Sequence, residues 1–193
     1  MADLAPHQQR LAAALRAYHG VDETEEEHRR RILAAVEADP AFWHRETLPG
    51  HVTGSAFVAA PALDALLLVH HRRLDRWLQP GGHDEGERDP ARTALREVGE
   101  ETGLRAYAFF GAPALFDLDV HRIPAAGAMP AHDHLDVRFL LVADPSQELR
   151  PDPREARTAR WFPLAAAAAA LGEEGGLRAV RKIEEIRAQA SSK

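Results

Sequence analysis

The sequence predicts an α/β protein, with two helices before a β-sheet and a helix at the C-terminal end. Apolar residues recur at helical spacing up to residue 40 and again after residue 164. Between residues 51 and 71, two apolar runs on either side of a proline have the length and composition of buried strands. These patterns place a sheet between helical segments, which is typical of the α/β class.

The chain is predicted to begin with two helices, in an extension that covers residues 1–45. Leu11 and Leu15 recur at helical spacing, and Gly20 interrupts the pattern. Thr24, with a glutamate three residues later, has the pattern of a capping box at the start of the second helix. The glutamates and arginines of residues 25–31 are spaced as favourable i,i+4 pairs, which indicates a solvated helix face and not a site for an anionic partner.

The middle of the chain is predicted to alternate between strands and a helix. Two strands within residues 51–71 meet at a turn near Pro61. Residues 90–102 are predicted to be helical, and two later stretches, residues 106–123 and 135–143, are strand-like. Residues 164–190 are again predicted to be helical, with glycines that interrupt the pattern.

The composition excludes several kinds of site and partner. Because the chain has no cysteine, it can form neither disulfides nor thiolate metal sites, and oxygen atoms or imidazoles must hold any metal ion. The longest apolar run, Leu164 to Leu171, is far shorter than the ~20 residues that span a bilayer. The formal net charge is −6 without a basic stripe, which is unlike a protein that binds long nucleic acids. Since the N-terminus also lacks the pattern of a secretory signal, we expect a cytoplasmic protein with a small-molecule partner.

A glutamate-rich helix is the most informative segment. Pro90 suits the first turn and Gly103 the end of a helix, so a helix of about three turns lies between them. Three glutamates fall at i, i+3 and i+4 on one face, and three aliphatic residues form a predicted buried stripe: Glu97, Glu100 and Glu101 on the first, Ala91, Leu95 and Val98 on the second. Like charges at these spacings destabilise a helix unless a cation lies among them. The pattern therefore favours a site for a hard divalent ion, which prefers carboxylate oxygens.

This segment resembles the box of the Nudix hydrolases, G-x5-E-x7-R-E-U-x-E-E-x-G-U, in which U is aliphatic. Gly82 matches the first glycine, and residues 96–104 match the whole second half, spacing included. With the preceding strand and the later segment 160–164, the resemblance extends over about residues 50–165. It implies a single domain over residues 1–193 with a Nudix-like α/β/α sandwich and a mixed β-sheet, in which residues 46–165 are the core and residues 166–193 form a C-terminal helix and tail.

One position departs from the family pattern. The first glutamate of the box is replaced by Arg88, and Glu87 stands one position earlier. Because that glutamate is usually peripheral to the metal site in the family, we expect the chemistry to survive, with Glu87 as a partial substitute.

The resemblance implies a pyrophosphohydrolase that cleaves a diphosphate linkage in a small nucleotide or nucleoside diphosphate derivative, by attack of water at phosphorus, with Mg²⁺ or Mn²⁺. Glu97, Glu100 and Glu101 would hold the ions, and the carbonyl of Gly82 would add a ligand. Arg96 would brace the glutamates through a charge-assisted hydrogen bond. The general base would be Glu101 or Glu155, and the latter belongs to a proline-bounded loop.

Basic and imidazole side chains around the box are the predicted substrate contacts: Arg73, Arg76, His83 and His134. The arginines precede the box, where they contact phosphates or decorate a hairpin. In a strand, His132, His134 and Asp136 share one face. That face binds a metal ion or a phosphate, or it is a hydrogen-bonded polar surface without a ligand.

The alternative of another class is a catalytically inactive Nudix-like module that binds a nucleotide for regulation. Retention of all three box glutamates favours the enzyme, and the lack of cysteine argues against a diphosphate isomerase of the same fold. The substrate, the number of metal ions and the oligomeric state, including a homodimer, stay open, since specificity in such folds lies in variable loops.

Overall fold

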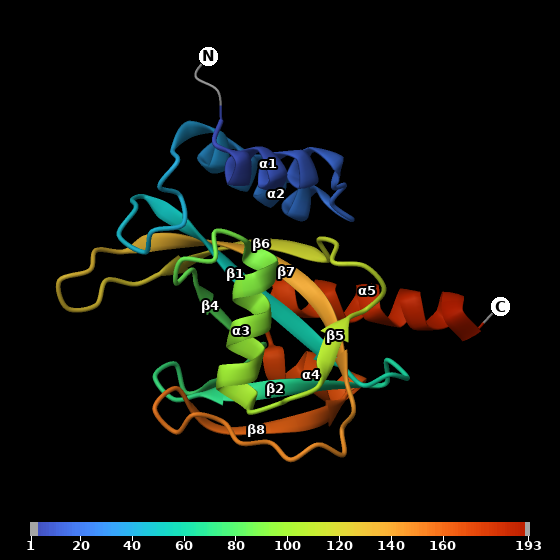
Figure 1. Ribbon diagram of the computed structural model, residues 1–193. Helices are drawn as coiled ribbons and strands as arrows, with labels where there is room; N and C mark the ends of the chain where they lie inside the picture. The colour runs from blue at the N-terminus through green and yellow to red at the C-terminus, as the bar shows by residue number, and fades with distance from the viewer. Residues whose placement is uncertain (1–3, 192–193) are drawn as a thin grey trace. The chain divides into compact units, whose positions relative to one another are not determined.

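The structure is a computed structural model that describes residues 4–191 (Figure 1). In chain order, its elements are α1 (Pro6–Ala17), α2 (Glu23–Ala38), β1 (Gly50–Ala59), β2 (Ala65–His71), β3 (Arg76–Leu78), β4 (Gly81–His83), α3 (Pro90–Thr102), β5 (Tyr107–Phe109), β6 (Asp117–Ile123), β7 (His132–Ala143), β8 (Ala156–Pro163), α4 (Leu164–Leu171) and α5 (Glu174–Ser191).

Most of the predicted elements are confirmed. The two N-terminal helices, the two strands around Pro61 and the helix of residues 90–102 lie where the sequence places them. The stretch of residues 106–123 is not one strand but two, β5 and β6, joined by an irregular segment. The short strands β3 and β4 were not predicted, because three-residue strands carry too little periodicity to be recognised.

The start of α2 differs from the prediction. Asp22, and not Thr24, caps the helix, because its side chain accepts a hydrogen bond from the backbone N–H of Glu25 (2.8 Å). The expected i,i+4 ion pairs are also wrong. Arg29 and Arg30 each pair with a glutamate three residues earlier, and Arg31 reaches Asp133.

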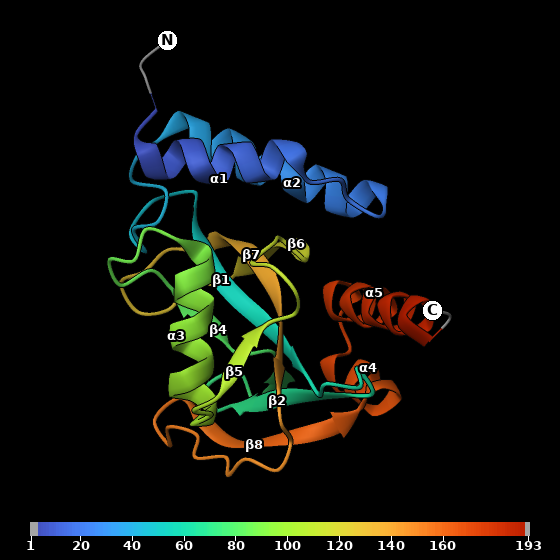
Figure 2. The same ribbon diagram turned by 45° about the vertical axis from the view of Figure 1, so that its right-hand side comes forward.

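The chain divides into two compact units, each assembled from separate segments. The first unit comprises residues 4–55, 82–94 and 114–139. In this unit α1 and α2 lie side by side (Figures 1 and 2), and α2 packs on β6. β6 pairs antiparallel with β7, from Asp117 opposite Arg138 to Ile123 opposite His132.

Buried charged groups tie the first unit together. The carboxylate of Glu25 is fully buried, and it accepts hydrogen bonds from the Tyr18 hydroxyl (2.5 Å) and from the backbone N–H groups of Val21 (2.9 Å) and Leu118 (3.1 Å). A single acidic side chain therefore links α1 and α2 to β6. The buried Arg138 guanidinium pairs in turn with three aspartates on β6 and β7: Asp117, Asp119 and Asp136.

The second unit comprises residues 56–81, 95–113 and 140–191. β2 pairs antiparallel with β8 along its whole length, and also with β1 and β3. Its three successive leucines are fully buried: Leu66, Leu67 and Leu68. β5 pairs with the end of β7, and α4 packs on β2, β3, β8 and α5. Figures 1 and 2 both show β2 and β8 running side by side next to α4. In the part of the chain that the structure describes, no helix is long and apolar enough to cross a membrane.

Glu25→Ala is expected to lower the free energy of unfolding by about 2–3 kcal/mol, because it removes the buried carboxylate that accepts hydrogen bonds from Leu118, Val21 and Tyr18. Thermal unfolding measures the effect. Glu27→Ala is the matched control on the same helix, since the Glu27 side chain is 50% exposed and pairs only at the surface. Equal stability of the two variants would contradict the role given to Glu25.

Candidate functional site

Three acidic side chains gather in the second unit. Glu97 and Glu101 lie one turn apart on α3, and Glu155 lies directly before β8. One carboxylate oxygen of each lies within 4.8 Å of the others. Glu97 and Glu101 are 8% and 5% exposed, whereas Glu155 is exposed to solvent. The arrangement therefore has two buried acids and one that contacts water.

The buried face of α3 differs from the predicted stripe. Val98 is fully buried as predicted, but Ala91 and Leu95 are only half-buried, and Ala94 is fully buried instead. The buried positions include the two glutamates at 97 and 101, spaced with Ala94 and Val98 as i, i+3, i+4 and i+7. The helix therefore turns two charged groups inward at the expense of two aliphatic ones.

Contacts within the second unit hold α3 and the acidic loop. The Tyr107 hydroxyl on β5 donates to the Leu95 carbonyl (2.8 Å). Gly99 makes this approach possible, because a Cβ there would lie only 2.8 Å from that hydroxyl oxygen. The Glu155 carbonyl accepts from the backbone N–H of Arg72 (2.7 Å), so the turn after β2 positions the loop that carries Glu155.

Glu100 does not join the three acids. Its side chain is 53% exposed, and its Oε2 accepts a hydrogen bond from Arg96 Nη1 (2.8 Å). The same Nη1 donates to Glu97 Oε1 (3.0 Å). Arg96 thus contacts one buried and one exposed glutamate, which is the bracing contact that the resemblance implies.

The backbone just before the box contacts Glu101, one of the two buried acids. The N–H of Gly81 donates to Glu101 Oε2 (2.9 Å). Gly82, whose carbonyl is expected to be a metal ligand, directly follows Gly81 in β4.

Burial strongly affects the protonation of two of these acids. Burial raises the pKa of Glu97 to about 7, against the opposing effect of Arg96. Burial also raises the pKa of Glu101 to about 8, although the Gly81 N–H opposes it, and the neighbouring acids Glu97 and Glu155 raise it further. The group is therefore partly protonated near neutral pH unless a cation compensates. Its hard oxygen donors fit a divalent ion such as Mg²⁺ or Mn²⁺.

The predicted substrate arginines lie at the turn between β2 and β3. Arg73 is exposed, and Arg76 pairs with Glu173, with 2.5 Å between Nη1 and Oε1. In this structure Arg76 is thus engaged with a carboxylate that a phosphate would have to displace.

The predicted histidines belong to a larger cluster in the first unit. Nε2 of His83 lies 3.2 Å from Nε2 of His134, and His132 and His51 complete the group. Sequence reasoning did not single out His51 for this cluster. The sequence offers little indication of this, because His51 lies on β1, far along the chain from the other three histidines.

The segment in which the box departs from the family pattern forms a compact turn. Asp84 accepts hydrogen bonds from the backbone N–H groups of Gly86 (2.9 Å) and Arg88 (2.5 Å). Arg88 has a φ of 51°, in the left-handed region. Glu87 Oε2 accepts from the backbone N–H of Glu85 (2.7 Å). The acid proposed as a substitute is thus held within the turn.

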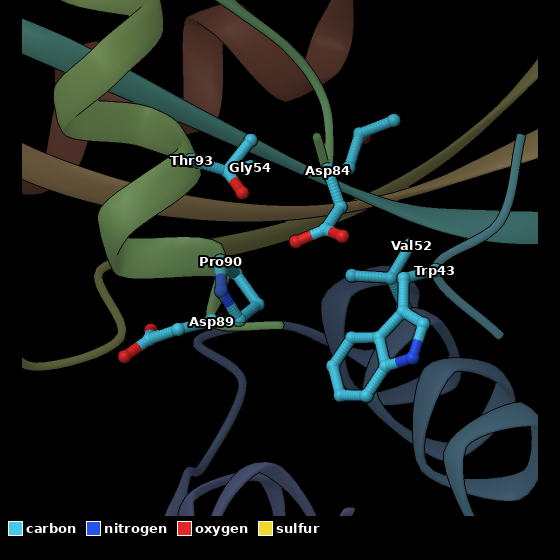
Figure 3. A pocket seen from close by; sticks show the side chains of 8 residues that line it. Trp43, Val52, Gly54, Asp84, Asp89, Pro90 and Thr93 are labelled. Atoms are coloured by element: carbon cyan, nitrogen blue, oxygen red, sulfur yellow. The ribbon is translucent and has the colours of Figure 1, made fainter. Parts of the chain in front are cut away.

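A small pocket opens beside the start of α3 (Figure 3). Its lining includes Trp43, Val52, Asp84 and Pro90, and Figure 3 shows the Asp84 carboxylate directed into the space between the helix and the Trp43 ring. Because Asp84 already accepts two backbone hydrogen bonds in the turn, we assign it a structural role.

Comparisons with known proteins match most of this chain to one family. Residues 51–183 match the NUDIX domain family. A human m7GpppN-mRNA hydrolase is 30% identical over 158 residues, which cover 74% of this chain and 48% of that protein. The chain thus spans about half the length of this curated relative.

Solved structures share the fold. A C. elegans Ap4A hydrolase in a binary complex matches with a TM-score of 0.57 at 18% identity, covering 72% of this chain and 98% of that one. An E. coli dihydroneopterin triphosphate pyrophosphohydrolase matches with a TM-score of 0.53 at 17% identity, covering 68% and 92%. These likenesses confirm the predicted α/β arrangement with a mixed sheet.

Glu101→Gln is expected to stabilise the metal-free protein at about pH 8 and to change its stability little at about pH 5. Because the pKa of Glu101 is raised to about 8 from the ordinary 4.5, folding takes up a proton between these values, and stability falls as the pH rises through this window. We expect a gain on the order of 2 kcal/mol at the higher pH.

Thermal unfolding in the presence of a chelator measures this gain, which should raise Tm by about 4–8 °C. Glu100→Gln, at the exposed neighbouring position, is the matched control. A gain of the same size for Glu101→Gln at both pH values would contradict the electrostatic origin.

Proposed function

Because the chain belongs to the Nudix family, we propose that it is a metal-dependent pyrophosphohydrolase that cleaves a diphosphate linkage in a small nucleotide or nucleoside diphosphate derivative. The observation that carries the proposal is the group formed by Glu97, Glu101 and Glu155, whose oxygens lie within 4.8 Å of one another. Acids gathered this closely, two of them buried, repel one another when charged, and a bound cation would favour their charged forms.

Glu97, Glu101 and Glu155 are the proposed ligands of Mg²⁺ or Mn²⁺, and Glu100 and the carbonyl of Gly82 are further candidates. When bound, the ion would neutralise charge that develops on the phosphate oxygens and make water a better nucleophile. Arg96 is a positioning residue, because it holds Glu97 and Glu100 through one nitrogen. This contact limits the rotamers open to both glutamates.

We propose Glu155 as the general base. It is exposed and therefore contacts water, whereas Glu101 is buried and its Oε2 already accepts the Gly81 N–H. In the proposed step, the water oxygen bonds to phosphorus while the bond from phosphorus to the bridging oxygen breaks. The proton of the water passes to a carboxylate oxygen of Glu155. Glu101 is the alternative base.

The relatives support a nucleotide-type substrate without selecting one. By name they are hydrolases of Ap4A, of m7GpppN-mRNA and of dihydroneopterin triphosphate. Arg73, Arg76, His83 and His134 remain the proposed substrate contacts, and for Arg76 this requires release from Glu173. The formal net charge of −6 favours a small substrate over a long polyanion. A cytoplasmic location and a homodimer stay predictions.

Glu97→Gln and Glu101→Gln are each expected to lower kcat by ~10²-fold or more, which corresponds to ~3 kcal/mol in the barrier. The reason is that a neutral amide oxygen is a weaker partner for a hard cation. The measurement is product release from a panel of nucleoside diphosphate derivatives with Mg²⁺ or Mn²⁺. Glu184→Gln, at an exposed position on α5, is the control and should keep the wild-type rate.

Full activity in the presence of a chelator would refute metal catalysis altogether. Full activity of Glu101→Gln, with metal dependence retained, would refute only the assignment of that residue.

Arg88 separates the enzyme from the inactive binding module. If the missing box acid is peripheral, Arg88→Glu should change the rate by less than ~10-fold, or ~1.4 kcal/mol. Glu87→Ala should then reduce the rate more than Arg88→Ala, because Glu87, one position before Arg88, could replace the lost carboxylate through a small shift of the loop. A wild-type protein that binds nucleotide without turnover, and gains turnover from Arg88→Glu, would establish the inactive module instead.

A further inference from the structure

We propose that His51, His132 and His134, with His83 beside them, form a second metal site in the first unit, selective for Zn²⁺ or a similar transition-metal ion. One ring nitrogen of each of the first three lies within 4.8 Å of the others. None of these residues belongs to the acidic group on α3, but His83 and His134 are also proposed substrate contacts, so Zn²⁺ binding is tested without substrate and without turnover.

His51 presents the most direct sign of a ligand. Its side chain is fully buried on β1, and its Nε2 is a buried nitrogen without a hydrogen-bond partner. The other nitrogen, Nδ1, faces the Thr47 carbonyl at 3.4 Å, which favours the tautomer that carries the proton on Nδ1. Nε2 then carries a lone pair, and a buried polar atom without a hydrogen-bond partner costs free energy unless something binds it.

His132 is oriented in the same way. Its Nδ1 lies 2.9 Å from the Pro130 carbonyl, which leaves Nε2 as the free acceptor. Metal-binding histidines commonly donate the non-coordinating N–H to a backbone carbonyl, which fixes the tautomer and the ring orientation. His51 and His132, from different strands, therefore both make the contact with a backbone carbonyl that is common for metal-binding histidines.

His134 and His83 supply nitrogens at a suitable spacing. Their Nε2 atoms are 3.2 Å apart. Two nitrogens bound to one tetrahedral Zn²⁺ at 2.0–2.1 Å stand about 3.3 Å from each other. The three histidines that lie within 4.8 Å need to approach by at most about 1.5 Å to reach that spacing.

The cluster suits a transition metal better than a phosphate or Mg²⁺. Burial lowers the pKa of His134 and that of His51, which disfavours the cationic forms of both imidazoles. Neutral imidazoles do not attract an anion, and they are the ligands that Zn²⁺, Cu²⁺ and Ni²⁺ prefer, whereas Mg²⁺ prefers oxygen.

Asp136, the third member of the polar face predicted on β7, is not available as an oxygen ligand. It accepts hydrogen bonds from the hydroxyls of Thr53 (3.0 Å) and Ser55 (2.8 Å) and from Arg138 Nε (2.7 Å). These three donors therefore engage the Asp136 carboxylate. The polar face of β7 thus consists of a hydrogen-bonded carboxylate and, next to it, the imidazoles of the cluster.

The experiment is a Zn²⁺ titration of the full chain, after chelator treatment, against a chromophoric competitor. The background is the double variant Glu97→Gln/Glu101→Gln, in which the acidic group is weakened as a competing site. We expect one equivalent of Zn²⁺ to bind this background. His134→Gln is expected to weaken that binding at least about tenfold. His19→Ala, at an exposed histidine of the same unit, is the matched control and should leave the binding unchanged.

Two further measurements keep the proposal falsifiable if a cluster variant fails to fold. Co²⁺ added to the background protein should give the visible spectrum of a tetrahedral nitrogen site, and Zn²⁺ should shift the imidazole nitrogen resonances of His51, His132 and His134. No bound Zn²⁺ in the folded background protein would overturn the proposal. So would unchanged Zn²⁺ affinity in a folded His134→Gln, or resonance shifts confined to other histidines.

Discussion

The burial of acidic side chains on the inward face of α3 is the interaction on which the site depends. Glu97 and Glu101 occupy the stripe that aliphatic residues would fill in an ordinary surface helix, and burial raises the pKa of both. Arg96 and the Gly81 N–H compensate only part of the desolvation. Charging these two buried acids therefore lowers the stability of the protein, and the proposed divalent cation would link metal binding to stability.

Much of the helix could be predicted, but its orientation could not. Proline and glycine set its limits correctly at residues 90 and 102. The i, i+3, i+4 spacing places three glutamates near one another but does not say which of them face the interior. That choice depends on tertiary packing: the Tyr107 hydroxyl contacts the helix backbone, and the Gly81 N–H donates to Glu101. Consequently Glu155, which comes from a distant loop, takes the place in the acidic group that the sequence gives to Glu100.

The histidine cluster could likewise be predicted only in part from the sequence. Strand alternation predicts that His132, His134 and Asp136 share a face, because neighbours on one strand are fixed by the pleat. It cannot predict that His51 lies against them, since that contact requires β1 and β7 to be placed together. Nor can it predict that two hydroxyls of β1 and Arg138 engage Asp136, which separates this carboxylate from the imidazoles. Strand periodicity thus identifies which residues share the face of β7, but contacts with β1 determine which of them are available to bind a ligand.

The two donor sets of this chain differ in the property that governs metal selectivity. Carboxylate oxygens are hard donors, whose negative charge suits Mg²⁺ or Mn²⁺, and their pKa values rise when no cation is present. Imidazole nitrogens are softer donors, and they suit a transition-metal ion that accepts few ligands in a tetrahedral arrangement. Raising the pH removes protons from Glu97 and Glu101 through the range of about 7 to 8. Occupancy of the acidic group should therefore rise with pH near neutrality, because a cation competes with protons for these carboxylates.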